Sequence, residues 1–134
     1  MTDYKQQSKR WLDQSKYDLS QAILSLKNKS YAYSCFFAEQ SAQKSLKAFL
    51  IYHKQLHINI HSVAALLSKA STFQKLFYDL IDKGKKIDKY YLTTRYPDAL
   101  PEGLIPFEAY NKNEAKEAIK IAKDIFNFSA KELK

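Results

Sequence analysis

The sequence predicts an all-α fold, an up-and-down bundle of about five helices with a long proline-containing connection before the last helix. The chain has 134 residues but only two glycines and three prolines, fewer turn-forming residues than a sheet-rich chain of this length needs. Apolar residues make up 46% of it, and one Trp, ten Tyr and eight Phe can build a substantial core. We therefore expect a single helical domain spanning residues 1–134.

Two long helices open the chain. The first is expected from about residue 3 to 27, because side chains suited to a core recur there at helical spacing: Trp11, Ser15, Leu19, Ala22, Ile23 and Leu26. Residues 28–30 form a short connection, and Ser30 is the expected cap of a second helix that reaches His53 or Gln55. So short a connection requires the two helices to be antiparallel.

Two further helices are expected after a loop at residues 56–61, where β-branched residues mix with Asn59. One should span residues 62–70 and bury Val63, Leu66 and Leu67. The next should span residues 72–91, because large apolar residues and one glycine recur in alternating steps of four and three: Phe73, Phe77, Leu80, Gly84, Ile87 and Tyr91. The glycine on this seam indicates a close approach between two helices.

All three prolines and the other glycine fall within residues 93–110, which therefore form the long irregular connection. Loops of this kind often carry function. The last helix is expected to begin near Asn111, since Glu114 three residues later would complete a capping box. Its buried face comprises Ala115, Ala118, Ile119, Ala122, Ile125 and Phe126.

A carboxylate in the middle of an apolar stripe is the most informative feature of the second helix. Glu39 shares one helical face with Ala32, Cys35, Phe36, Ala42, Leu46, Phe49 and Leu50. The adjacent strip is polar and holds Gln40, Gln43, Lys44 and Lys47. We expect Glu39 to point inward or into a groove and the polar strip to bind a ligand or partner.

Composition restricts the classes of function. The formal net charge of +8 suits a phosphate-bearing ligand, a nucleic acid or an acidic partner, although the lysines are scattered and could equally form a solvated surface. The chain begins without the apolar core of a signal peptide, and lysines interrupt every apolar run before it is long enough to cross a bilayer. A cytoplasmic protein without a membrane span is expected.

The residues that most often carry catalysis or metal binding do not form a convincing set. His53, His57 and His61 are spaced four apart, but the loop at 56–61 separates them, so a metal site is disfavoured and His61 is the best of the three for a capping or groove role. Cys35 lies on the apolar stripe and is interpreted as a packing residue. Two isolated glycines cannot build a phosphate-binding loop, so side chains and helix ends would have to hold any nucleotide.

Three segments together resemble the HEPN domain family: AEQSAQKSLKAFLIYH at residues 38–53, HSVAALL at 61–67, and TRYPDALPEG at 94–103 followed by a tyrosine and an Ala-rich last helix. The resemblance implies a compact bundle of about five helices, often homodimeric. It also implies a minimal nucleotidyltransferase partner, encoded beside it in a two-gene prokaryotic module that resembles a toxin–antitoxin pair.

Members of this family fall into two functional groups, and the resemblance alone does not choose between them. Some are proposed to bind nucleotides. Others are ribonucleases, which carry an arginine followed four to six residues later by a histidine. The only arginines here, Arg10 and Arg95, have no histidine at that spacing. The ribonuclease interpretation thereby loses its catalytic pair, and no catalytic residue is assigned.

Arg95 needs its own explanation because it lies where the fourth helix gives way to the proline-rich connection. Its planar guanidinium binds a carboxylate or a phosphate with two parallel hydrogen bonds. It could pair with Glu39 or Asp98 and attach the loop to the bundle, or it could contact a phosphate. Tyr96 and Tyr110 flank the same connection and are candidates for ligand contact.

Three classes of function remain open at this point. The leading interpretation is a homodimeric binding or regulatory module with a nucleotidyltransferase partner, holding an ATP-like nucleotide in a groove lined by Glu39, Gln43, Lys47 and Arg95. The second is an RNA-processing ribonuclease. The third is a purely structural interaction domain with no specific ligand.

Overall fold

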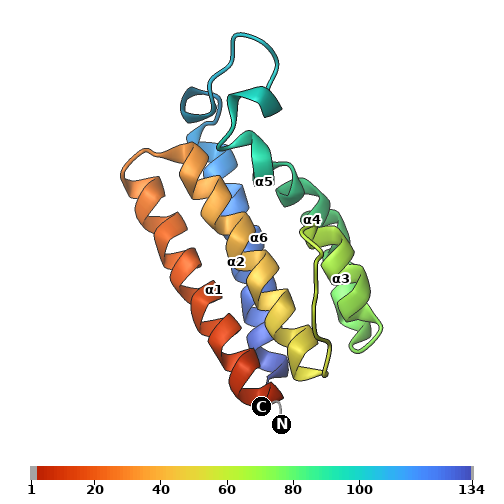
Figure 1. Ribbon diagram of the computed structural model, residues 1–134. Helices are drawn as coiled ribbons and strands as arrows, with labels where there is room; N and C mark the ends of the chain where they lie inside the picture. Colours follow the sequence, from red (N-terminus) through yellow and green to blue (C-terminus); the bar gives the residue numbers. More distant parts are fainter. Residues whose placement is uncertain (1–2, 134) are drawn as a thin grey trace.

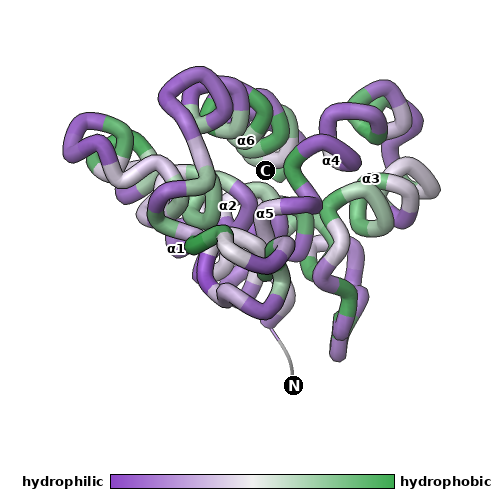
Figure 2. Tube along the Cα trace, turned by 90° about the horizontal axis from the view of Figure 1, so that it is seen from above, coloured by the Kyte–Doolittle hydropathy of each residue, from purple (hydrophilic) through white to green (hydrophobic). Residues whose placement is uncertain are grey.

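The computed structural model describes residues 3–133 and confirms the all-α prediction, since these residues form helices and connections without a strand (Figure 1). The long helices are α1 (Tyr4–Lys27), α2 (Tyr31–Tyr52) and α6 (Lys112–Glu132). The shorter ones are α3 (Val63–Ser71), the 3-10 helix η1 (Lys75–Leu80), α4 (Ile81–Asp88) and α5 (Tyr90–Thr93). Two 3-10 turns, η2 (Pro97–Ala99) and η3 (Pro106–Glu108), lie in the long connection. Figure 2, seen from one end, shows α3 and α4 as a pair beside α1, α2 and α6.

The chain reverses direction repeatedly along the bundle (Figure 1). Helices α1 and α2 are antiparallel, as the short connection predicted. An extended segment after α2 then returns along the bundle, so that α3 runs in the same direction as α2. Helices α4 and α5 run back, and the long connection turns the chain once more. As a result α6 is parallel to α2, and α1 begins where α6 ends.

Helix α2 is the centre of the fold and is buried on nearly all sides between Ala32 and Ile51. Small serines allow α1 to approach it closely, because their hydroxyls bond to the backbone of α2. Ser8 Oγ donates to the Ala48 carbonyl at 2.7 Å, and Ser15 Oγ donates to the Ser41 carbonyl at 2.7 Å. These hydrogen bonds satisfy buried hydroxyls that would otherwise be costly. The buried surface of α2 is therefore wider than the apolar stripe predicted from the sequence.

Aromatic side chains connect η1, α2 and α6 within the core. The ring of Phe77 on η1 lies 4.5 Å from that of Phe49 on α2 and 4.6 Å from that of Phe128 on α6, measured between centroids. A largely buried ion pair joins α1 to α2 as well, with Lys44 Nζ 2.7 Å from a carboxylate oxygen of Asp18.

Within residues 3–133, no helix is both long and apolar enough to cross a membrane.

Gly84 permits close packing of α4 on α3, which confirms the prediction from the sequence. A Cβ atom at this position would lie 2.7 Å from Leu67 Cδ1 and 3.1 Å from the backbone of Ala64. A methyl group here would displace the Leu67 side chain and press against the backbone of α3 at Ala64.

The prediction of one continuous helix over residues 72–91 was wrong, because this segment breaks into η1, α4 and α5. Gln74 has an extended backbone, and its side chain accepts from Leu76 N, so the 3-10 helix begins only after it. Phe77 is the one buried residue of η1, which leaves little packing to hold a regular α-helix there. The second break, at Lys89, follows Asp88, whose carboxylate accepts a hydrogen bond from the backbone N–H of Val63 at the start of α3.

Helix ends were predicted with mixed success. The capping box of Asn111 and Glu114 at the start of α6 is present with both hydrogen bonds. Ser30 occupies the N-cap position of α2, but its side chain makes no capping hydrogen bond. A cap that the sequence did not reveal is at α3, where the Asp88 carboxylate accepts from the backbone N–H groups of Val63 and Ala64.

Candidate functional site

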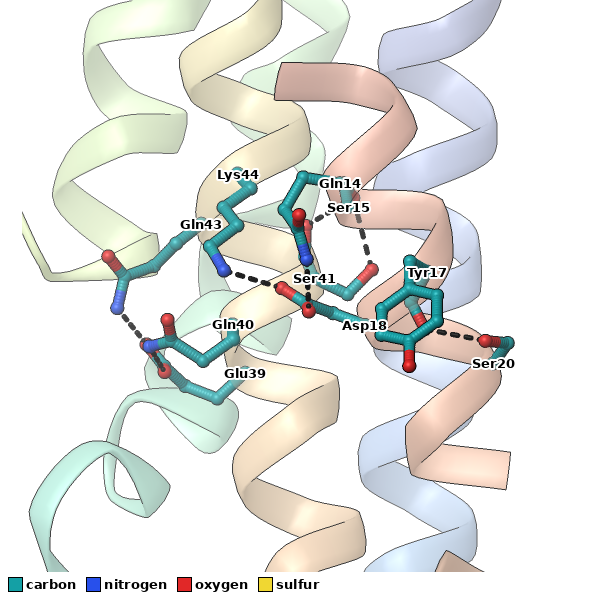
Figure 3. A network of polar contacts seen from close by, with 10 residues as sticks. All are labelled: Gln14, Ser15, Tyr17, Asp18, Ser20, Glu39, Gln40, Ser41, Gln43 and Lys44. Atoms are coloured by element: carbon teal, nitrogen blue, oxygen red, sulfur yellow. Dashed lines mark hydrogen bonds and ion pairs between the residues drawn. The ribbon is translucent and has the colours of Figure 1, made fainter. Parts of the chain in front are cut away.

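Glu39 is fully buried, as its position on α2 predicted. Its two carboxyl oxygens accept hydrogen bonds from neighbouring amides of the same helix, one from Gln43 Nε2 and one from Gln40 Nε2 at 2.9 Å. Figure 3 shows these three side chains on the side of α2 that faces away from α1 and the Asp18–Lys44 pair. Burial raises the pKa of Glu39 from 4.5 to about 7, and the two amides lower it only in part. Near neutral pH this site therefore gains or loses a proton.

The expected ion pair between Arg95 and Glu39 or Asp98 is absent among residues 3–133. The Arg95 guanidinium instead turns back to α5, the short helix that ends two residues before it, where Nε at 3.1 Å and Nη2 both donate to the Tyr91 carbonyl. An arginine at this place satisfies a carbonyl that the end of α5 leaves without a helical partner. Its charge acts on Glu39 only from a distance, as the smallest of the influences that lower that pKa.

Three aromatic rings surround the Arg95 guanidinium. Its central carbon lies 4.2 Å from the ring centroid of Phe36, 4.9 Å from that of Tyr96 and 5.2 Å from that of Tyr91. Such contacts are attractive because the ring faces carry partial negative charge. They also hold a flexible side chain in one orientation.

Ring contacts extend from this arginine in both directions. His61 stacks on Tyr91, with centroids 5.2 Å apart and planes 13° from parallel. On the other side Phe36 contacts Phe37, which contacts Tyr33. We call this continuous set the Arg95 face; it comprises Tyr33, Phe36, Phe37, His61, Tyr91, Arg95 and Tyr96. The sequence had singled out Arg95, Tyr96 and His61, but not the aromatic residues of α2 and α5 that join them.

Within residues 3–133 no hydrogen bond, ion pair or ring contact joins Tyr110 or Asp98 to Arg95. Tyr110 donates its hydroxyl to Thr93 Oγ1 and packs against Tyr90, which fixes the start of α6 to α5. Burial raises the pKa of Tyr110, as expected for a structural hydroxyl. Asp98 is exposed on η2.

Lys47 also lies away from Arg95, so the predicted groove is divided into two places. Its ammonium is 5.7 Å from the ring centroid of Trp11 on α1. It borders a cavity of about 430 Å³ that Glu39, Gln43 and Arg95 do not line. Burial lowers the pKa of Lys47, and the negative charge of Glu39 partly offsets this.

His53 and Cys35, two residues weighed in the sequence analysis, make packing contacts in the fold. Within residues 3–133 no three histidine, cysteine or acidic side chains gather as metal ligands would. His53 stacks on Phe73 at 4.8 Å instead. Cys35 is buried, and burial raises the pKa of its thiol to about 12, so the thiolate needed for nucleophilic attack is suppressed.

Comparison with known proteins gives consistent results. The family model described as HEPN domain matches residues 8–133. A curated protein of Methanocaldococcus jannaschii, named "Putative toxin MJ1304", is 25% identical over 126 residues, which are 88% of this chain and 82% of that protein. The crystal structure of TT1696 from Thermus thermophilus is 36% identical, with a TM-score of 0.87 over 94% of this chain and 98% of that one. The structure of ST0689, titled an archaeal HEPN homologue, is 29% identical, with a TM-score of 0.77 over 95% and 98% of the two chains.

Proposed function

The chain belongs to the HEPN domain family, and from that premise we propose that it is a regulatory binding module without autonomous catalysis. It works in the cytoplasm as a homodimer, beside a nucleotidyltransferase partner in a two-gene module of the toxin–antitoxin type. Its ligand is an ATP-like nucleotide. The name of the M. jannaschii relative supports the toxin–antitoxin assignment, and the Arg95 face supports the binding role.

The observation that carries this proposal is the state of the Arg95 guanidinium. Of its five N–H groups, only two, one on Nε and one on Nη2, have an acceptor among residues 3–133, and both use the same carbonyl. The rings of Phe36, Tyr91 and Tyr96 hold the group in place while Nη1 stays free to donate. A fixed, partly exposed guanidinium with free donors suits a phosphate, and flat rings beside it suit a base.

Glu39 and Gln43 influence the Arg95 face through the charge of Glu39. They form a buried pair of side chains on α2, and a charge on Glu39 would add negative potential near Arg95. When Glu39 is protonated, this negative potential is absent, so Arg95 attracts an incoming anion more strongly. This predicts tighter nucleotide binding below the Glu39 pKa than above it.

Exposed apolar surface on the Arg95 face supports assembly with a second copy. Tyr33 is 55% exposed, Tyr96 is 52% exposed, and the neighbouring Leu92 on α5 is 50% exposed. Contiguous exposed rings favour association because burying them removes apolar area from water. Light scattering should give a dimer for the wild type and a monomer for the Tyr33→Ser, Leu92→Ser double variant. A wild type that stays monomeric at every concentration would contradict the homodimer.

Calorimetric titration with ATP tests the nucleotide proposal. Wild-type protein should release or absorb heat with a saturating isotherm, and Arg95→Ala should lose affinity roughly tenfold or more because a charged hydrogen bond is removed. Lys16→Ala is the control, since it removes an exposed cation of α1 that neither the Arg95 face nor any other proposed site includes. The proposal fails if ATP gives no heat, or if Lys16→Ala loses binding and Arg95→Ala keeps it.

One observation favours testing a ribonuclease as the second candidate. Although no histidine follows either arginine at the family spacing, the fold places His61 and Arg95 against the same ring, that of Tyr91. Incubation of the pure protein with RNA at several pH values should leave the RNA intact if the binding proposal holds. RNA cleavage by the wild type that is lost in His61→Ala would contradict the binding proposal and favour the ribonuclease. A purely structural domain predicts neither cleavage nor stabilisation by ATP.

A further inference from the structure

The strongest unexplained group outside the Arg95 face is the ammonium of Lys47. This side chain is only 7% exposed, yet it forms no ion pair and no hydrogen bond with the residues that the structure describes. Its ammonium lies over the face of Trp11, and the negative charge of Glu39 also acts on it. A buried cation normally has a carboxylate or several acceptors, because desolvation is costly. The neighbouring lysine of the same helix, Lys44, has such a partner in Asp18.

The missing partner has room in the cavity beside this ammonium. The cavity measures about 430 Å³, within the range typical of small-molecule sites. It lies between α1, α2 and the connection that follows α2. Its apolar walls are Trp11, Ile51, Leu56 and Ile58.

Polar side chains line part of the same cavity. Gln7 and Asn59 are among them and offer side-chain amides. Arg10 lies beside Gln7, with its Nη1 donating to Gln7 Oε1 at 3.4 Å. No acidic side chain is among the lining residues. The cavity therefore combines the positive charge of a largely buried lysine with apolar walls and no negative charge among its lining residues.

We propose that this cavity, which we call the Lys47 pocket, binds a small organic anion. Its carboxylate or phosphate pairs with the Lys47 ammonium, and its flat apolar part packs against Trp11 and the aliphatic walls. An inorganic ion alone would satisfy the charge but would leave the apolar walls uncovered, so an anion with a flat apolar body binds better. The pocket is separate from the Arg95 face and does not depend on the function proposed for that face.

Trp11 provides a direct assay, since it is the only tryptophan in the chain. Its emission should be followed while wild-type protein is titrated with two matched pairs of probes, AMP with adenosine and benzoate with benzyl alcohol. At least one anion should change the emission to saturation, and its neutral counterpart should bind roughly tenfold more weakly or worse. Which anion responds distinguishes a phosphate from a carboxylate ligand. Equal binding of charged and neutral probes, or no saturation by either anion, would overturn the proposal.

Variants locate the binding in this pocket. Lys47→Met should lose the affinity for the responding anion by the same factor, whereas Lys16→Met, which removes an exposed lysine of α1, should keep it. Arg95→Ala should also keep it, which separates this site from the nucleotide proposal. Undiminished binding by Lys47→Met would overturn the assignment.

The unliganded stability of Lys47→Met gives a second, independent readout. Replacing an unpaired buried cation with an apolar side chain of similar length is neutral or stabilising. The melting temperature of the variant should therefore equal or exceed that of the wild type. A melting temperature several degrees lower, or failure to fold, would show that the ammonium already has a structural partner and would contradict the proposal.

Discussion

Replacing Glu39 with glutamine should change the pH dependence of folding. The pKa of this carboxyl is about 7 in the folded protein and 4.5 as an ordinary glutamate. The folded state therefore holds the proton more tightly than the unfolded state does. The resulting stability is fully present below pH 4.5, and it is lost as the pH rises through about 7.

The size of the effect follows from the two pKa values. Each pH unit between them corresponds to about 1.36 kcal/mol, so ionising Glu39 costs the fold roughly 3 kcal/mol at pH 8. Glutamine has the shape of the protonated acid and cannot lose a proton. The amides of Gln40 and Gln43, which now donate to the carboxyl, can rotate to offer an oxygen to the new amide. We expect the Glu39→Gln variant to exceed the wild type in stability at pH 8.

Urea unfolding at pH 5 and pH 8 measures this difference. The variant and the wild type should be similar at pH 5, and the variant should be more stable by about 2 to 3 kcal/mol at pH 8. Glu102→Gln removes an exposed carboxyl of the long connection and serves as the control with the same change in charge. If Glu39→Gln instead destabilises the protein at pH 8, or if its effect does not vary with pH, then Glu39 is a stabilised carboxylate and the reasoning is refuted.

Three further substitutions test the packing and the caps by thermal unfolding. Gly84→Ala should destabilise by about 1 to 3 kcal/mol because its Cβ would overlap Leu67, and an unchanged melting temperature would mean that α3 and α4 are less tightly packed. Asp88→Ala should cost about 1 to 2 kcal/mol through loss of the cap on α3; a neutral result would place that helix end in contact with water. Tyr110→Phe should cost about 1 kcal/mol through loss of its bond to Thr93, and no loss would mean that water satisfies both hydroxyls equally well.

Much of the fold could be predicted from the sequence because α1, α2 and α6 are long and periodic. Their boundaries were predicted to within a few residues, and the capping box at Asn111 marked the start of α6. The prediction of one helix over residues 72–91 failed because periodicity shows which residues face inward, but not whether the backbone stays helical throughout. The seam is present, but Asp88 turns to cap α3, a contact between residues 25 positions apart that spacing cannot reveal.

The candidate site was predicted only in its parts. Burial of Glu39 followed directly from helical spacing, and Gln43 was correctly placed beside it. The pairing of Glu39 with Arg95 was wrong, since the guanidinium bonds the nearby Tyr91 carbonyl instead. The separation of Lys47 from this cluster depends on Trp11, which belongs to another helix. A local contact decided the outcome for Arg95, and a contact between two helices decided the outcome for Lys47.

The most direct test of the central claim, that the guanidinium geometry of Arg95 makes this face a nucleotide site, is the ATP affinity of Arg95→Lys. Lysine keeps the positive charge but loses the planar donors that stack on Phe36 and Tyr96. Calorimetry should show an affinity roughly tenfold or more below that of the wild type. Equal affinity of the two proteins for ATP would contradict the claim.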